Sequence, residues 1–182
     1  MIKHFLLCMS LLVLTTSLPA QQGGTPPSPP EKATATLSGK TVTIIYSSPR
    51  VRGREGKIFT KDGLISHNPH YPVWRAGANS ATTLETDADL TIGDLSVPKG
   101  KYTLFVDISN PDEWTLIVSK DTGEWGLAYK AADDLGKVQM QMRKPPRMVE
   151  DLVWKITPMS EGKGQITLAW EDHSASVPVE AH

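Results

Sequence analysis

The 182-residue sequence has little cysteine, no excess of either charge and no long apolar run. The single cysteine, Cys8, excludes a small fold held together by several disulfides. Nineteen Lys and Arg residues against 20 Asp and Glu give a net charge of -1. That balance argues against nucleic acid as the main partner, because nucleic-acid-binding domains usually carry a basic excess. No apolar stretch approaches the ~20 residues of a membrane span, which excludes a multi-span membrane protein.

The first 20 residues have the pattern of a secretory signal peptide. A charged start at Lys3 precedes an apolar stretch at residues 5–14, and small or polar residues follow up to Ala20. We expect cleavage after Ala20, with cleavage after Ser17 as the alternative. The expected product is an exported protein, periplasmic or extracellular in a bacterium, with no membrane span and no cysteine left.

Residues 21–32 are rich in proline and glycine and are interpreted as a linker, so the folded domain is expected over residues 33–182. In the domain, apolar residues recur with the period of two that is typical of β-strands, between turns rich in Gly, Pro and Asn. We expect an all-β, single β-sandwich domain, jelly-roll or Ig-like, of about nine or ten short strands. The expected strands are residues 33–37, 41–46, 82–86, 89–92, 101–108, 114–119, 138–142, 152–156, 165–170 and 177–180.

Three segments carry more specific expectations. The nearly continuous apolar run at residues 102–106 predicts a strand that is buried on both faces. Pro178 predicts that the last strand lies at a sheet edge, because proline lacks the amide hydrogen of a central strand. Residues 125–135 fit either a short helix or an irregular crossing.

Motifs of known catalytic sites are missing: the sequence contains neither G-x-S-x-G nor H-E-x-x-H. The glycines in residues 53–58 are too closely spaced for a phosphate loop, and the segment that starts at Asp87 lacks the glycine of a calcium loop. His67 and His70, together with Asp62 and His173, could in principle share a metal ion, but loop histidines are more often solvated. We predict no catalytic residue, no metal and no cofactor.

The least strand-like part of the domain, residues 47–77, is also its most basic part. Arg50, Arg52 and Arg54 alternate along the chain, so an extended backbone would direct them to one side. Three guanidinium groups there could hold a carboxylate, phosphate or sulfate. The alternative is a solvated edge that uses arginine as protection against pairing.

Trp74 and Arg75 follow at the end of that segment. Trp74 could stack on a sugar or pack beneath the sandwich, and packing is the commoner role of tryptophan. We expect Arg75 to be partly buried and paired with an internal carboxylate, for which Glu85 is the nearest candidate along the chain. Gly77 and Asn79 suit a turn that needs positive φ angles.

Several stretches carry a resemblance to a known family. They are S-P-R-V-R-G-R at residues 48–54, I-F at 58–59, V-W-R-A-G-A-N-S-A-T-T at 73–83, V-P-K-G-K-Y-T-L-F at 97–105, E-W-T at 113–115 and L-A-W-E at 168–171. Together they resemble the DUF2911 family of exported bacterial proteins of unknown function. The resemblance implies export and a single domain, and it supplies no activity. The chain departs from the family pattern at residues 69–72, where it has P-H-Y-P in place of a frequent P-Y-G.

These observations favour a non-enzymatic binding domain for a glycan or small anion. The candidate ligand-binding residues are Arg50, Arg52, Arg54, Trp74, Arg75 and Asn79. One alternative is a cell-envelope hydrolase that uses His67, His70 or Asp62. Another is a structural partner in an envelope complex. The oligomeric state stays open.

Overall fold

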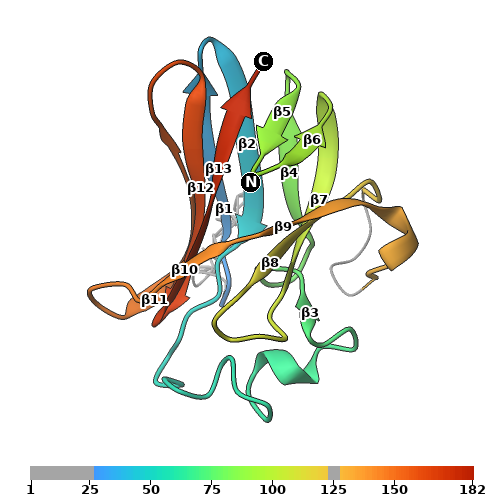
Figure 1. Ribbon diagram of the computed structural model, residues 1–182. Coiled ribbons are helices and arrows are strands. Elements are labelled where there is room, and N and C mark those ends of the chain that lie inside the picture. Colours follow the sequence, from blue (N-terminus) through green and yellow to red (C-terminus); the bar gives the residue numbers. More distant parts are fainter. Residues whose placement is uncertain (1–26, 123–127) are drawn as a thin grey trace, which may run out of the picture.

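The computed structural model describes residues 27–122 and 128–182, which form two antiparallel sheets stacked as a sandwich (Figure 1). The seven-stranded sheet runs in the order β1 (Pro30–Leu37), β2 (Lys40–Ser47), β4 (Thr82–Thr86), β7 (Gly100–Asp107), β8 (Thr115–Ser119) and β9 (Asp134–Gln139), with β3 (Val73–Trp74) also on β7. The six-stranded sheet runs in the order β11 (Val149–Pro158), β12 (Lys163–Glu171), β13 (His173–Ala181), β5 (Leu90–Ile92) and β6 (Leu95–Val97), with β10 (Gln141–Arg143) also on β13.

The all-β prediction is confirmed. In the described part of the chain, helix is limited to two 3-10 turns, η1 (Ile65–His67) and η2 (Ala131–Asp133). Strands outnumber the about nine or ten expected from the pattern of segments, because β3 and β6 are too short to leave a period of two and because the strand expected at residues 138–142 forms two strands, β9 and β10. No helix among the described residues is long and apolar enough to cross a membrane.

The hydrophobic core lies between the two sheets and follows the period of two. In β12, Ile166, Leu168 and Trp170 are buried, while the residues between them are partly exposed. β7 differs, because its residues from Tyr102 to Val106 are all buried, as the apolar run predicted. Its outward Phe105 is covered by Tyr129, with the ring centroids 4.9 Å apart. β7 is therefore buried on both faces, as its sequence predicted.

The strand expected at residues 138–142 is divided between the two sheets. β9 pairs with β8 in one sheet, β10 pairs with β13 in the other, and Met140 lies between them. The Met140 amide donates a hydrogen bond to the Trp114 carbonyl at 2.8 Å, which fixes the crossing point. Of the ambiguous segment 125–135, residues 125–127 lie outside the described residues, and the remainder contains η2 and the start of β9.

The prediction that Pro178 marks an edge strand is wrong. β13 lies inside its sheet, with β12 on one side and both β10 and β5 on the other. β10 pairs with Ser174–Ser176 and β5 pairs with Val179–Ala181, so Pro178 lies where the neighbouring strand changes. The missing amide hydrogen therefore costs no ladder bond on that side.

At the N-terminal end of the domain, β1 begins at Pro30, so the last three residues of the expected linker belong to the sheet.

Residues 48–72 join β2 to β3 and close one end of the sandwich (Figure 1). The segment first reaches the opposite sheet, where the Val51 amide donates to the Glu150 carbonyl and the Leu152 amide to the Pro49 carbonyl, both at 2.9 Å. It then crosses beneath the sheets through η1 and returns to β3. The closing segment thus ties the seven-stranded sheet to β11, the edge strand of the six-stranded sheet.

Phe59 anchors the closing segment to the core. Its ring contacts Trp74, Trp114, Trp170 and His173, with centroid distances of 5.8, 4.9, 5.7 and 4.5 Å. These five residues are called the aromatic cluster below. Aromatic pairs at such distances add to the stability that burial alone provides. The closing segment is therefore packed as part of the domain, and this packing fixes the surfaces on either side of it.

Candidate functional site

The three alternating arginines do not lie on an extended strand, so the condition under which their spacing would direct them to one side is not met. Arg50 forms an isolated bridge with Asp151, and Val51 is fully buried. Arg52 and Gly53 then take positive φ angles of 51° and 70°, which turn the chain. The Arg54 amide closes this turn by donating to the Val51 carbonyl at 3.2 Å. The pairing of residue 51 with β11 therefore sets where each guanidinium goes.

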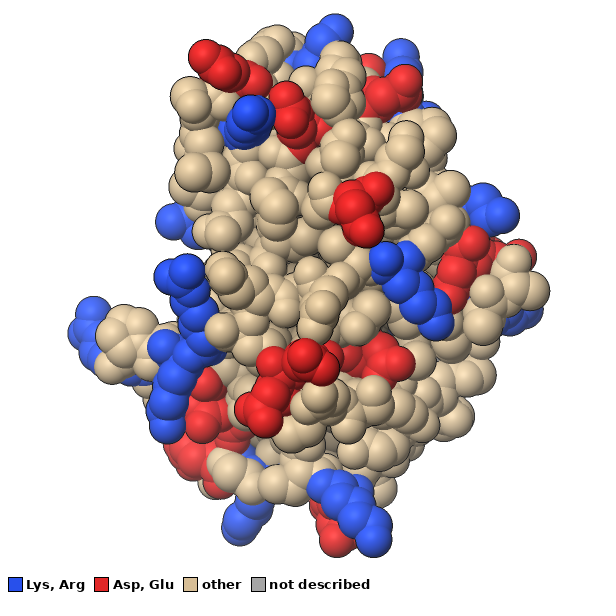
Figure 2. All heavy atoms as spheres, viewed as in Figure 1, with Lys and Arg blue, Asp and Glu red and all other residues tan. Residues whose placement is uncertain are grey.

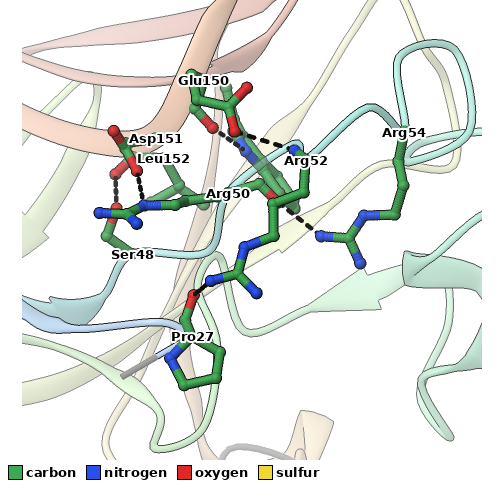
Figure 3. A network of polar contacts seen from close by, with 9 residues as sticks. Pro27, Ser48, Arg50, Arg52, Arg54, Glu150, Asp151 and Leu152 are labelled. Carbon is green, nitrogen blue, oxygen red and sulfur yellow. Dashed lines mark hydrogen bonds and ion pairs between the residues drawn. The ribbon is translucent and has the colours of Figure 1, made fainter. Parts of the chain in front are cut away.

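Each of the three arginine side chains has a different partner (Figure 3). Arg50 Nε lies 2.6 Å from Asp151 Oδ1 in a half-exposed ion pair. Arg52 reaches toward the Pro27 carbonyl at 3.5 Å, while its amide donates to Glu150 Oε1 at 3.0 Å. Arg54 donates to two backbone carbonyls, of Val51 at 2.9 Å and of Arg50 at 2.6 Å. Arg54 is thereby held in place by neutral acceptors, and no acidic group of residues 27–122 or 128–182 forms an ion pair with it.

Trp74 belongs to the core. It is 3% exposed and stacks on Trp170 with the ring centroids 5.9 Å apart. Its indole nitrogen donates to the Gly77 carbonyl at 3.2 Å. Packing is thus its role in the structure, and its ring offers no open face on which a sugar could stack.

The turn after Arg75 uses positive φ at Ala76 and Asn79, with values of 51° and 56°. Asn79 fits the expectation, whereas Gly77 does not adopt a positive φ. Gly77 is needed for space, because a Cβ there would lie 3.1 Å from the Ser47 carbonyl oxygen. The Ala76 carbonyl accepts a hydrogen bond from the Trp154 indole at 2.9 Å, which ties the turn to β11.

Arg75 has no carboxylate partner among the described residues, so the predicted pair with Glu85 is wrong. Glu85 pairs instead with Lys101 at 2.8 Å, because Lys101 is its direct neighbour in the β4–β7 register. The Arg75 Nε and Nη1 atoms are enclosed and find no hydrogen-bond acceptor in the described part of the chain. Burial lowers the pKa of the Arg75 guanidinium from its ordinary value.

Arg75 also differs from the other side chains that have an enclosed polar atom without a hydrogen bond. Each of the others has an oppositely charged group within 4 Å: Lys130 beside Asp121, Lys137 beside Asp134, and Asp172 beside His173. Among the residues that the structure describes, Arg75 has none. A buried charge without a counter-charge is unfavourable, and such a group calls for a specific explanation.

Five of the six candidate residues line one pocket of about 460 Å³: Arg50, Arg52, Arg54, Trp74 and Arg75. We call it the arginine pocket. Asn79 does not line it but supports its wall, because Asn79 Nδ2 donates to the carbonyl of Ser28, a lining residue, at 3.3 Å. The lining also includes His67, and none of the described residues that form it is Asp or Glu.

This charge distribution differs from that of the surface in general. On the face in Figure 2, acidic and basic side chains are interspersed over the two sheets. The whole chain carries a net charge of -1, yet four arginines converge on one pocket. Opposed charges on the surface screen each other, whereas a concave wall of one sign concentrates its field on whatever enters.

Sequence reasoning missed several lining residues, among them Leu64, Ile65, Asn68 and Trp170. Leu64 and Ile65 left a signal, since they are the second apolar pair of the closing segment, after Ile58 and Phe59. Trp170 could not be found in this way, because it comes from the end of β12 and reaches the pocket only through the stacking on Trp74.

The residues of the hydrolase alternative do not form a cluster. His67 lies in the arginine pocket, where its Nδ1 donates to the Gly63 carbonyl at 2.9 Å. His70 packs instead near Tyr129, with the ring centroids 6.0 Å apart. No hydrogen bond or ion pair among the described residues joins Asp62, His67 and His70. The structure therefore gives no acid–base pair of the kind that this alternative requires.

A second pocket, of about 520 Å³, lies on the other side of the aromatic cluster and is lined by Glu171, Asp172 and His173. We call it the acidic pocket. One ligand atom from each of the three lies within 4.8 Å of the others, so these residues could hold a metal ion. They also have protein partners: Glu171 Oε1 accepts a hydrogen bond from the Gly56 amide, and His173 Nδ1 lies 2.7 Å from Asp172 Oδ1.

The sequence matches the profile of a family described as "Protein of unknown function (DUF2911)" over residues 28–179. The chain belongs to the DUF2911 family. The match covers the sandwich and both pockets, and it confirms the family that the motifs indicated. A comparison with curated proteins gives no match, and neither does a comparison with solved structures.

Proposed function

We propose that this DUF2911 protein is an exported binding protein whose β-sandwich holds a small anionic ligand in the arginine pocket. The observation that carries the proposal is the lining itself. Four arginines and a histidine converge there without a carboxylate among the described lining residues. Export is inferred from the pattern of the first 20 residues and awaits its own test.

Arg75 is the residue that most favours an anionic ligand. Its guanidinium is partly buried, with Nε and Nη1 enclosed, and it lacks a counter-charge among the described residues, so a bound anion would supply that counter-charge. The arginine pocket is preorganised at Arg54, because two backbone carbonyls fix the position of this side chain before any ligand binds. Guanidinium groups match the geometry of carboxylate and phosphate oxygens.

A neutral glycan fits the arginine pocket less well. Proteins that bind sugars through tryptophan present the flat face of the ring, and both Trp74 and Trp170 are almost fully buried. A pair between Arg75 and Glu85 would have favoured the alternative of a structural partner, and this pair is not formed, because Glu85 pairs with Lys101. The anion is the hypothesis that the geometry favours.

Calorimetric titration of inorganic phosphate, at low ionic strength, tests the proposal. We expect saturable binding to the protein from which residues 1–20 have been removed, and at least tenfold weaker binding to Arg75→Met. Arg143→Met is the matched control, because Arg143 lies on β10 outside the arginine pocket. Absence of phosphate and sulfate binding, or equal loss in the two variants, would contradict the proposal.

Export has a separate measurement. Mass spectrometry of the protein recovered from a periplasmic extract should give a chain that begins near Gln21. An intact Met1, or a lipid attached to Cys8, would contradict export by the expected signal.

A further inference from the structure

One wall of the arginine pocket is apolar. It is formed by Leu64 and Ile65, at the start of η1, and by Pro69. Ile65 is buried, but Leu64 is 41% exposed. Six large apolar side chains are exposed in the described part of the chain, and Leu64 is the one among them that lines this pocket. A single exposed leucine is ordinary on a protein surface, but this one faces a cavity whose other wall is cationic.

Leu64 is held in that position by the backbone. Its amide donates to the Lys57 carbonyl at 2.9 Å, and the Ile65 amide donates to the Ile58 carbonyl at 3.1 Å. The neighbouring Phe59 is fixed in turn by the aromatic cluster. The apolar wall is therefore as preformed as the arginine wall, and ligand binding need not order it.

The size of the pocket also argues against a bare inorganic ion as its ligand. Its volume of about 460 Å³ lies in the range of sites for small organic molecules. A water molecule takes roughly 30 Å³ of liquid volume, so a phosphate or sulfate ion would leave most of the space to water in contact with Leu64 and Ile65. Apolar surface that stays wet contributes nothing to binding, whereas burying it beneath a ligand is favourable.

We propose that the arginine pocket binds an amphiphilic organic anion, in which a carboxylate or phosphate group is joined to a compact apolar body. This inference rests on the proposed anion site and adds the chemistry of the remainder of the ligand. The anionic group lies against Arg75 and Arg54, and the apolar body lies against Leu64. A polyhydroxylated body would leave its hydroxyl groups desolvated against that wall without partners.

Phenyl phosphate and inorganic phosphate form the pair of probes. We expect phenyl phosphate to bind the wild-type protein about tenfold tighter, since the phenyl ring removes apolar surface from water. Leu64→Ser should reduce the advantage of phenyl phosphate over inorganic phosphate, both measured on the variant, to about threefold or less. Met159→Ser is the matched control, because Met159 is 69% exposed and lies outside the arginine pocket.

The outcomes separate this inference from the proposed function. If phosphate binds but phenyl phosphate binds no tighter, or if Leu64→Ser behaves like Met159→Ser, the anion site stands and the amphiphilic ligand is wrong. If neither these two compounds nor their carboxylate counterparts, acetate and benzoate, bind, both proposals fail. Acetate and benzoate repeat the comparison for carboxylates. The anionic group of the ligand is identified by whether phenyl phosphate or benzoate binds more tightly.

Discussion

The arginine pocket and the acidic pocket lie on either side of the aromatic cluster and are built from neighbouring residues, yet they differ in how their charges are balanced. Trp170 lines the first pocket and Glu171, the next residue of β12, lines the second. In the acidic pocket, Glu171, Asp172 and His173 find partners within the protein. In the arginine pocket, Arg75 finds none among the described residues. The difference teaches that a charge cluster alone says little, whereas a desolvated charge without a counter-charge points to a ligand.

The largest expected effect comes from removing Trp170, a member of the aromatic cluster that also lines the arginine pocket. Trp170 is 1% exposed, stacks on Trp74 and contacts Phe59. Trp170→Ala should lower the free energy of unfolding by about 3–5 kcal/mol, because it leaves a large cavity in the core. Urea denaturation measures this. A loss below ~1 kcal/mol would mean that the aromatic cluster does not hold the closing segment in place.

Arg75→Met should separate binding from stability. Since methionine removes an uncompensated, partly buried charge, we expect the free energy of unfolding without ligand to stay unchanged or to rise by up to about 1 kcal/mol. Phosphate at ten times its dissociation constant should stabilise the wild-type protein by roughly 1.4 kcal/mol and should not stabilise the variant. Urea midpoints at matched ionic strength check both parts. A loss of several kcal/mol without ligand would show that Arg75 has a structural partner after all.

Glu171 should make the stability of the protein depend on pH through the acidic pocket. Burial, with Asp172 and Glu55 adding repulsion, raises the pKa of the Glu171 carboxyl above its ordinary 4.5, against the lowering effects of the Gly56 amide and His173. The protonated form is therefore favoured in the folded state. The raised pKa of Glu171 stabilises the folded state fully at pH values below the ordinary pKa. This stabilisation is lost as the pH rises through the raised pKa.

Compared with Glu171→Gln, the wild-type protein should thus lose stability as the pH rises from below 4.5, the ordinary pKa of this group, to above its raised pKa. Urea midpoints of both proteins across that range measure the difference, and the other carboxylates cancel in the comparison. If the difference between the two midpoints is constant, or changes in the opposite direction, the assignment to Glu171 is wrong.

The smallest effect is expected at the Arg50–Asp151 pair. Its side chains are 37% and 50% exposed, so solvent and salt screen the attraction. Breaking the pair with Asp151→Asn should cost no more than about 1 kcal/mol of unfolding free energy. A double-mutant cycle with Arg50→Gln gives the coupling energy. A coupling well above that value would show that the edge of the arginine pocket depends on this pair.

The strands could be predicted from the sequence because period two is a local property. The continuous apolar run at residues 102–106 is also a local property, and it predicted that β7 is buried on both faces. The division of β9 from β10 at Met140 could not be predicted, since an uninterrupted alternation does not reveal that the strand changes sheets. Pro178 misled for a related reason, because the gap between β10 and β5 that accommodates it is made by distant segments.

The candidate site was predicted in part. Arg50, Arg52, Arg54, Trp74 and Arg75 stood out by composition, and one pocket collects all five. The partner of Arg75 could not be predicted from proximity in sequence, because the β4–β7 register pairs Glu85 with Lys101. The apolar wall and Trp170 were missed, since they reach the pocket through the folding of the closing segment around Phe59.

The claim that Arg75 is a cation awaiting an external counter-charge can be tested at the guanidinium itself. Nuclear magnetic resonance of the arginine Nε–H groups compares three environments in one experiment. Arg50 Nε donates to Asp151, Arg54 Nε donates to the Val51 carbonyl, and Arg75 Nε has no described acceptor. On titration with phosphate, the Arg75 signal should shift most and should saturate together with the calorimetric binding curve. An unchanged Arg75 signal, with shifts confined to the exposed arginines, would contradict the central claim.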